Sequence, residues 1–199
     1  WDEASLNNAS PGRNRVAATS PLPYIHETPP EPNRTDRILP TAMSLLDILS
    51  AQSTLVGLKG HSKDEIIEEL VGSLEVGAAI ADRDKVLQAV LEREKIMSTG
   101  IGDGIAIPHG KTDAVSQLSA ALGIHKRGVD FEALDGEPAF VFFLLVSPAN
   151  VSGPHIKALA RISRMLKNDT FKKRLIEAES ADEILGIIAE EEQSHPATG

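Results

Sequence analysis

Apolar and polar positions alternate along the chain in patterns that predict helices and strands in turn from about residue 43 onward. Apolar residues three and four apart predict helices over residues 62–77, 82–93, 154–166, 171–178 and 184–191, with a short one over 44–49. Strands are predicted over residues 54–58, 105–107, 117–125 and 139–146. The last of these is apolar at every position, as in a strand that is covered on both faces. This order predicts an α/β domain in which helices flank a single mixed β-sheet.

Residues 98–111, with the sequence STGIGDGIAIPHGK, form the least ordinary stretch of the chain. Three glycines in five residues predict a loop ahead of the strand at 105–107. His109 follows that strand directly, so we expect its imidazole to project at the strand end. Gly110 has no side chain and is expected to leave room for another molecule to approach.

Residues 1–42 differ in composition from the rest of the chain. They hold seven of the 12 prolines and the only Trp and Tyr, without an apolar period. Such a stretch cannot bury enough apolar surface to offset its ordering entropy, so we expect a disordered extension or linker. Met43 is interpreted as lying at or near the natural start of a domain over residues 43–193, followed by a flexible tail at 194–199.

Composition and charge narrow the classes of function. Of the 199 residues, 41% are hydrophobic and 25% charged, as in globular domains. Twenty basic and 29 acidic residues give a formal charge of −9, which disfavours nucleic acid as a partner. The lack of cysteine excludes disulfides, thiolate metal sites and cysteine nucleophiles. No apolar run approaches the roughly 20 residues that span a bilayer, so we expect a cytoplasmic protein without membrane insertion.

Two of the six histidines have surroundings that suggest chemistry. Besides His109, His155 follows Gly-Pro and falls in the first turn of a predicted helix. The free N–H groups and the positive dipole end at that position favour a neutral imidazole and attract an anion. The other four are expected to be packed or solvated side chains: His26, His61, His125 and His195.

The motifs REK at residues 93–95 and STGIGDGIAIPHGK at 98–111 closely resemble the signature of the enzyme IIA domains of the fructose–mannitol class. These domains belong to the bacterial phosphoenolpyruvate-dependent phosphotransferase system. The resemblance continues through FEALDG at 131–136, FLLVSP at 143–148 and HIKALA at 155–160, and so covers about residues 43–192. It implies the α/β sandwich of that class, and the chain looks most similar to the nitrogen-regulatory branch.

The resemblance implies a phosphoryl carrier rather than a stand-alone catalyst. His109 is implied as the phosphoacceptor, which takes a phosphoryl group from an HPr-type carrier protein. His155 is implied to donate a hydrogen bond to the phosphoryl oxygens and Arg93 to neutralise their charge, with Thr99 and Gly110 as secondary candidates. A neutral imidazole with a pKa near 6.5 is a usable nucleophile at cytoplasmic pH, so neither a metal nor an organic cofactor is expected.

Two roles share this chemistry. In a regulator, phosphorylation adds a charge of roughly −2 at one surface point and decides which target protein binds. In a fructose- or mannitol-type sugar transport system, the phosphoryl group passes on to a IIB domain. No IIB or membrane segment is fused to this sequence, which favours the regulatory role.

Three other interpretations concern the same residues or their neighbours. The glycines at 100–104 precede a strand, whereas a dinucleotide-binding loop leads from a strand into a helix. A zinc site could be imagined from His109, Asp113 and His155, but no further close ligand is evident. The basic residues over 157–174 are interpreted as a solvated helix face, with docking of an acidic partner as the alternative.

Overall fold

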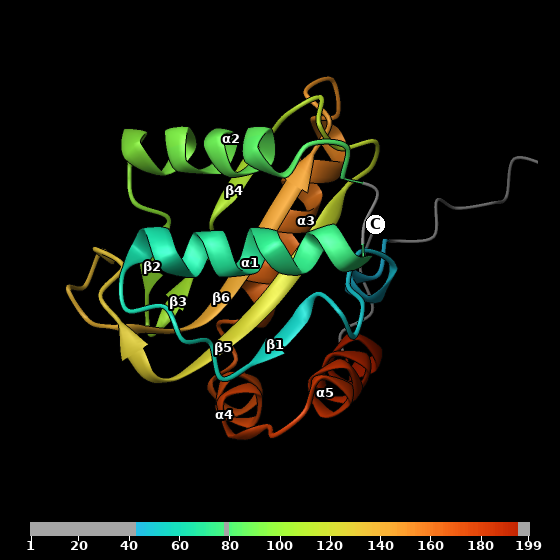
Figure 1. The fold of residues 1–199 in the computed structure, drawn as a ribbon. Coiled ribbons are helices and arrows are strands. Elements are labelled where there is room, and N and C mark those ends of the chain that lie inside the picture. Colours follow the sequence, from blue (N-terminus) through green and yellow to red (C-terminus); the bar gives the residue numbers. More distant parts are fainter. Residues whose placement is uncertain (1–42, 78–79, 195–199) are drawn as a thin grey trace, which may run out of the picture. The chain divides into compact units, whose positions relative to one another are not determined.

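The structure is a computed structural model that describes residues 43–77 and 80–194. The expectations for residues 1–42 and for 195–199 of the predicted tail lie outside these described residues, whereas Ser194, the first residue of that tail, ends a helix. The strands are β1 (Thr54–Val56), β2 (Gly100–Gly102), β3 (Ile105–Ala106), β4 (His109–Lys111), β5 (Ser119–Val129) and β6 (Ala139–Ser147). The helices are the 3-10 turn η2 (Leu45–Asp47), α1 (Lys63–Gly77), α2 (Arg83–Ile96), α3 (Gly153–Met165), α4 (Asp169–Glu177) and α5 (Ala181–Ser194). Together they form one mixed sheet with helices on both faces, which confirms the predicted fold class (Figure 1).

The sheet places two short strands end to end along one side of β6. The strand order is β1-β5-β6-β3-β2, and β4 also pairs with β6. β5 runs antiparallel to β6, whereas β3 and β4 both run parallel to it. Ile107 and Pro108 separate β3 from β4, and the Pro108 carbonyl still accepts a hydrogen bond from the backbone N–H of Leu145 at 3.0 Å. Pairing with β6 therefore continues through the break.

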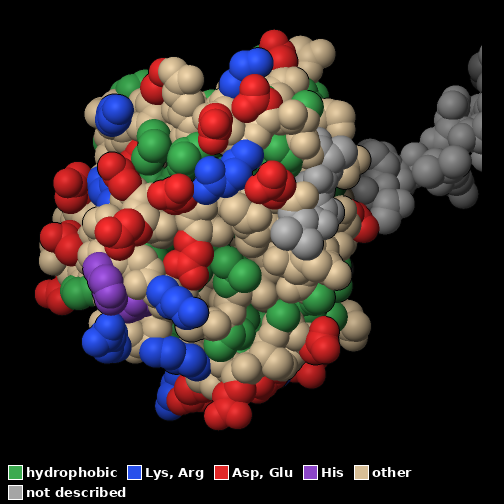
Figure 2. All heavy atoms as spheres, viewed as in Figure 1, with side chains coloured by type: hydrophobic (Ala, Val, Ile, Leu, Met, Phe, Trp, Pro, Cys, Tyr) green, Lys and Arg blue, Asp and Glu red, His purple; other side chains and the backbone are tan. Residues whose placement is uncertain are grey.

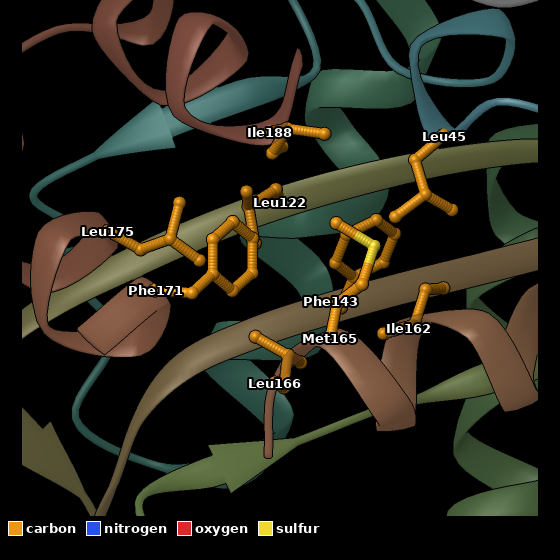
Figure 3. Close-up of a pocket in the computed structure, with 9 residues that line it drawn as sticks. All are labelled: Leu45, Leu122, Phe143, Ile162, Met165, Leu166, Phe171, Leu175 and Ile188. Atoms are coloured by element: carbon orange, nitrogen blue, oxygen red, sulfur yellow. The ribbon is translucent and has the colours of Figure 1, made fainter. Parts of the chain in front are cut away.

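Alternation along β6 divides the apolar core into two layers. Val141, Phe143 and Leu145 pack with the layer of α3, α4 and α5, and Phe142, Leu144 and Val146 with the layer of α1 and α2. In Figure 1, α1 and α2 lie on the near face of the sheet and α3 behind it. A void of about 10 Å³ in the first layer is lined only by apolar side chains, among them Leu122, Phe143 and Ile162 (Figure 3). Because a water needs roughly 10–15 Å³ and polar partners, this void is a packing defect rather than a binding site.

The glycine-rich segment is a hairpin, so the prediction of a loop is wrong for most of it. β2 and β3 pair antiparallel, and the turn between them consists of Asp103 and Gly104. Both turn residues have positive φ, 54° and 77°. Positive φ at both positions is typical of the type I′ turn, one of the two common two-residue hairpin turns, and glycine adopts this conformation freely while aspartate tolerates it. The glycines of this segment therefore allow the chain to reverse tightly, so that β2 can pair with β3.

Helix bounds also differ from the predictions, most clearly at residues 44–49, at the end of α2 and at both ends of α5, which spans Ala181–Ser194 rather than 184–191. Residues 44–49 form only the three-residue turn η2. Ser44 and Asp47 close a capping box at its start, and the side chains of Ser50 and Ser53 accept hydrogen bonds from each other's backbone N–H groups in the turn that follows. α2 continues to Ile96, three residues beyond its predicted end at 93.

Charged side chains of both signs are interspersed over the face formed by α1 and α2 (Figure 2). In the basic stretch at 157–174, several cations are paired with carboxylates of this chain, and the side chains of two of them, Arg161 and Lys172, are only 15% exposed. These pairs are Arg161 with Glu192, Lys172 with Asp169, and Arg174 with Glu190.

Within residues 43–77 and 80–194, the helices lack the combination of length and apolar character that crossing a membrane requires.

Candidate active site

His109 opens β4, where it pairs with Leu145 of β6. Its Nδ1 lies 2.9 Å from the carbonyl oxygen of Ile107. A carbonyl can only accept, so Nδ1 carries the ring proton and Nε2 keeps its lone pair. Burial lowers the pKa of His109 below its usual value, and Arg93 acts in the same direction, whereas the Ile107 hydrogen bond and Glu94 oppose it. The half-buried ring is therefore neutral at neutral pH and has a free Nε2.

Gly110 has a different role from the one expected. A Cβ at this position would lie 3.1 Å from the backbone nitrogen of Val90 and 3.2 Å from the carbonyl carbon of Ala89, both in α2. These distances are below ordinary van der Waals contact, so α2 already occupies the space beside Gly110. The expectation that another molecule approaches here is wrong, because the missing side chain lets α2 pack directly on β4.

α3 brings a second imidazole beside His109. The ring centroids of His109 and His155 are 5.8 Å apart, with the planes inclined by 57°. His155 lies in the first turn of α3, directly after Pro154, and is only 3% exposed. Its Nδ1 is 2.8 Å from the hydroxyl oxygen of Ser147 at the end of β6. Burial, followed by the charges of His109 and Lys111, lowers the pKa of His155 to about 4, so this ring is neutral as well.

Arg93 lies in the last turn of α2, at the edge of the same site. Its Nη1 donates a hydrogen bond to the carbonyl of Met97 at 3.0 Å, which holds the half-buried guanidinium across the helix end. Because its charge lowers the pKa of His109, Arg93 is within electrostatic reach of that ring. The structure therefore brings His109 and His155 into contact and places Arg93 within electrostatic reach of His109.

Thr99 is buried, and its polar groups are engaged inside the protein. Its backbone N–H donates to both carboxylate oxygens of Glu94, at 3.0 and 3.1 Å, and its hydroxyl donates to one of them at 2.5 Å. Lys63 completes the cluster with a 3.2 Å ion pair to Glu94. These contacts fix the link between α2 and β2. Sequence reasoning did not single out Glu94, although it stands in the REK motif.

Two more residues near the rings were also missed. Lys111 is two positions after His109 and thus on the same face of β4, and its Nζ donates to the hydroxyl of Ser152 at 2.7 Å, just ahead of α3. The period of two along a strand could have indicated Lys111. Ser147 pairs with Lys111 in the sheet register, but its contact with His155 depends on the path from β6 into α3, which no sequence pattern reveals.

The zinc alternative finds no support among the described side chains. In residues 43–77 and 80–194, no group of three His, Asp or Glu side chains is arranged to hold a metal ion, and this includes His109, Asp113 and His155. Of the other histidines, His61 is exposed and His125 is buried at 4% exposure, as expected, whereas His26 and His195 lie outside the described residues.

A basic hollow of about 280 Å³ lies away from this site. It is lined by Gly57, Leu58, Lys59, His61, His125, Lys126 and Arg127. Figure 2 shows histidine and basic side chains gathered at the lower left of the face. Ile124 directly precedes His125, which lines this hollow, and pairs with Val141 near the start of β6. His109 pairs with Leu145 near the end of β6. The hollow and His109 therefore lie toward opposite ends of β6.

Comparison with known proteins agrees with the motifs of the site. The sequence model of the family described as "Phosphoenolpyruvate-dependent sugar phosphotransferase system, EIIA 2" matches residues 47–191. The chain is 38% identical over 146 residues to the fructose-specific EIIABC component of Bacillus subtilis, which covers 73% of this chain but only 23% of that protein. It is 33% identical to a nitrogen regulatory protein of Bradyrhizobium diazoefficiens, over 74% of this chain and 95% of that protein.

Solved structures show the same fold. The nitrogen regulatory protein IIA-Ntr from Neisseria meningitidis matches with a TM-score of 0.68 at 31% identity, covering 73% of this chain and 99% of that one. The mannitol enzyme IIA of Escherichia coli, solved in complex with phosphorylated enzyme IIB, matches with a TM-score of 0.62 at 26% identity. That match covers 71% of this chain and 97% of the mannitol protein.

Proposed function

Because the chain belongs to the EIIA 2 family of the phosphoenolpyruvate-dependent sugar phosphotransferase system, we propose that it is a phosphoryl carrier that accepts its cargo on Nε2 of His109. One observation carries this proposal. The Ile107 carbonyl holds the ring proton on Nδ1, which leaves a nucleophilic Nε2 on a neutral ring beside His155. The donor is a phosphohistidine on an HPr-type carrier protein.

In the transfer step, the lone pair of His109 Nε2 attacks the phosphorus of the donor phosphohistidine. The bond from phosphorus to the donor nitrogen breaks as the new P–N bond forms, and its electron pair returns to the donor imidazole. The His109 ring gains positive character because Nδ1 keeps its proton. The Ile107 carbonyl, 2.9 Å from Nδ1, stabilises that charge.

The phosphoryl group carries a charge of roughly −2 and has little covalent attachment in the transition state, so the surrounding groups must hold it. Arg93 supplies a guanidinium that can bind two oxygens at once. His155 supplies a ring nitrogen from the first turn of α3, whose positive dipole end also favours an anion. Lys111 adds an ammonium on the His109 face of β4.

Exposed apolar side chains next to these residues form the proposed docking surface for the protein partners. Ile96 and Met97 follow Arg93 at the end of α2 and are 81% and 62% exposed, and Ile156, beside His155, is 63% exposed. Apolar side chains exposed to this degree are typical of protein contact sites. The same surface would serve the HPr-type donor and the next acceptor in turn.

The regulatory role is the first candidate for the purpose of phosphorylation, because the nitrogen regulatory protein from Neisseria meningitidis matches with a TM-score of 0.68. The phosphorylation state of His109 would then decide which target protein binds. The second candidate is the IIA step of a fructose- or mannitol-type transport system, which is favoured by the 38% identity to the fructose-specific component of Bacillus subtilis. Both roles place the reaction in the cytoplasm.

The test is reconstitution with phosphoenolpyruvate, the first enzyme of the system and HPr, with mass-spectrometric mapping of the modified residue. We expect one acid-labile phosphoryl group on His109 and none on His109→Ala, with the exposed His61→Ala as a matched control that is labelled normally. Labelling of another residue in the unmodified protein would refute the assignment. Adding a IIB protein then separates the two roles, since rapid onward transfer indicates transport and a persistent phosphohistidine indicates regulation.

A further inference from the structure

Resting on the function assigned to His109, we propose that Ser147 is a positioning residue for phosphoryl transfer. Its hydroxyl donates to Nδ1 of His155 and thereby keeps the proton of that ring on Nε2, the nitrogen available to the phosphoryl group. Ser147 does not touch the phosphoryl group and acts only through His155.

The contact is short and excluded from water. Ser147 is the last residue of β6 and is fully buried, and His155 is 3% exposed. The hydroxyl oxygen lies 2.8 Å from Nδ1. A neutral imidazole has one N–H and one lone pair, and a hydroxyl can either donate or accept. The direction of this hydrogen bond therefore determines which nitrogen of His155 carries the proton.

The surroundings of the hydroxyl decide the direction. The other acceptor within reach is the carbonyl of Val151, 3.5 Å from the hydroxyl oxygen of Ser147. That distance is at the outer limit for an O–H···O hydrogen bond, whose usual length is about 2.7–2.8 Å. If Nδ1 carried the proton, the hydroxyl would have to send its own proton along this long contact. If Nδ1 accepts, the hydroxyl makes one well-formed bond inside the protein, which is the arrangement that buried polar groups adopt.

The consequence is that the two rings hold opposite tautomers. In His109, the Ile107 carbonyl fixes the proton on Nδ1, so Nε2 presents a lone pair for attack. In His155, the Ser147 hydroxyl occupies Nδ1, so Nε2 presents an N–H. An N–H attracts phosphoryl oxygens, whereas the lone pair of the other tautomer would repel them. One ring is thereby prepared as the nucleophile and its neighbour as the hydrogen-bond donor.

The first test reads the tautomer of His155 directly in the ¹⁵N-labelled resting protein. Long-range ¹H–¹⁵N correlation spectra at neutral pH are expected to show a protonated Nε2 and an unprotonated Nδ1. Ser147→Ala should give a mixture of tautomers. The matched control is Ser119→Ala, since Ser119 is also buried, at 3% exposure, but its hydroxyl contacts the Gln117 carbonyl. A proton on Nδ1 of His155 in the unmodified protein would overturn the proposal, and that reading needs no variant.

The second test measures single-turnover transfer from phosphorylated HPr. Ser147→Ala is expected to slow labelling of His109 about 10-fold or more, by analogy with metal-binding histidines, for which loss of the orienting hydrogen-bond partner has effects on this scale. Ser119→Ala should retain the rate of the unmodified protein. An unchanged rate in Ser147→Ala would refute the positioning role. If the unmodified protein fails to label His109 at all, the proposed function is wrong, and the tautomer spectra still decide the Ser147 contact.

Discussion

Gly110→Ala tests whether the space beside His109 belongs to the protein's own packing or to a visiting partner. The added Cβ would lie 3.0 Å from Cγ2 of Val90, 3.1 Å from the Val90 backbone nitrogen and 3.2 Å from the Ala89 carbonyl carbon. The valine side chain can rotate, but the helix backbone must shift by a few tenths of an ångström against a packed core. Overpacking of this kind costs about 1–3 kcal/mol. For a domain of this size, each kcal/mol lowers Tm by about 2–4 °C.

Urea and thermal unfolding measure the effect, with Gly72→Ala as the matched control. Gly72 lies in α1, and a Cβ there would meet no atom within 4 Å. Its replacement should therefore stabilise the domain by up to about 1 kcal/mol through helix propensity. If Gly110 instead existed to admit a partner, Gly110→Ala would unfold like the unmodified protein and would only weaken partner binding. An unchanged midpoint would thus refute the packing explanation.

Three further predictions concern the site. Arg93→Ala should slow single-turnover labelling of His109 by about 10²-fold, the scale for losing one donor to transition-state charge; a normal rate would remove Arg93 from the site. Thr99→Val leaves the buried Glu94 carboxylate without one donor, so urea unfolding should show a loss of about 1–3 kcal/mol, and an unaltered midpoint would contradict the cluster. Because the folded pKa of His155 is about 4 against 6.5 for the free side chain, the unfolded chain binds the extra proton and stability declines as the pH falls from 6.5 toward 4. This decline should be smaller in His155→Gln when unfolding midpoints at about pH 7 and about pH 4.5 are compared; an equal decline would show that His155 does not titrate in this way.

Most of the fold could be predicted because the buried face of a helix or strand repeats its apolar residues with the period of that element. The uninterrupted apolar run at 139–146 identified β6 as the strand covered on both faces, and its alternating side chains do feed two core layers. The hairpin at 100–106 was missed because glycine is a signal for loops, while its use in a two-residue turn depends on the strands that flank it. The helix predicted over 44–49 is only the short turn η2 because Ser50 and Ser53 bond each other's backbone N–H groups directly after it.

Residues of the candidate site could be predicted from the sequence where their neighbours along the chain define their surroundings. His109 is framed by Pro108 and Gly110, and His155 by a helix start, so both could be singled out. Contacts between segments distant in the chain could not be read in this way. The hydroxyl of Ser147 reaches His155 only because α3 turns back over the end of β6, and α2 fills the space beside Gly110 only because it crosses β4.

The end-to-end pairing of β3 and β4 along β6 leaves the acceptor imidazole without a hinge. The residues on both sides of His109 are tied to one central strand, by the Pro108 carbonyl before it and the Gly110 pairing after it. A mobile arm that carries a bound group between two sites needs a flexible linker, and this paired backbone does not provide one. Under the proposed function, a phosphoryl group on His109 would therefore stay fixed relative to the sheet, and each transfer would require the donor or acceptor protein itself to bind at His109.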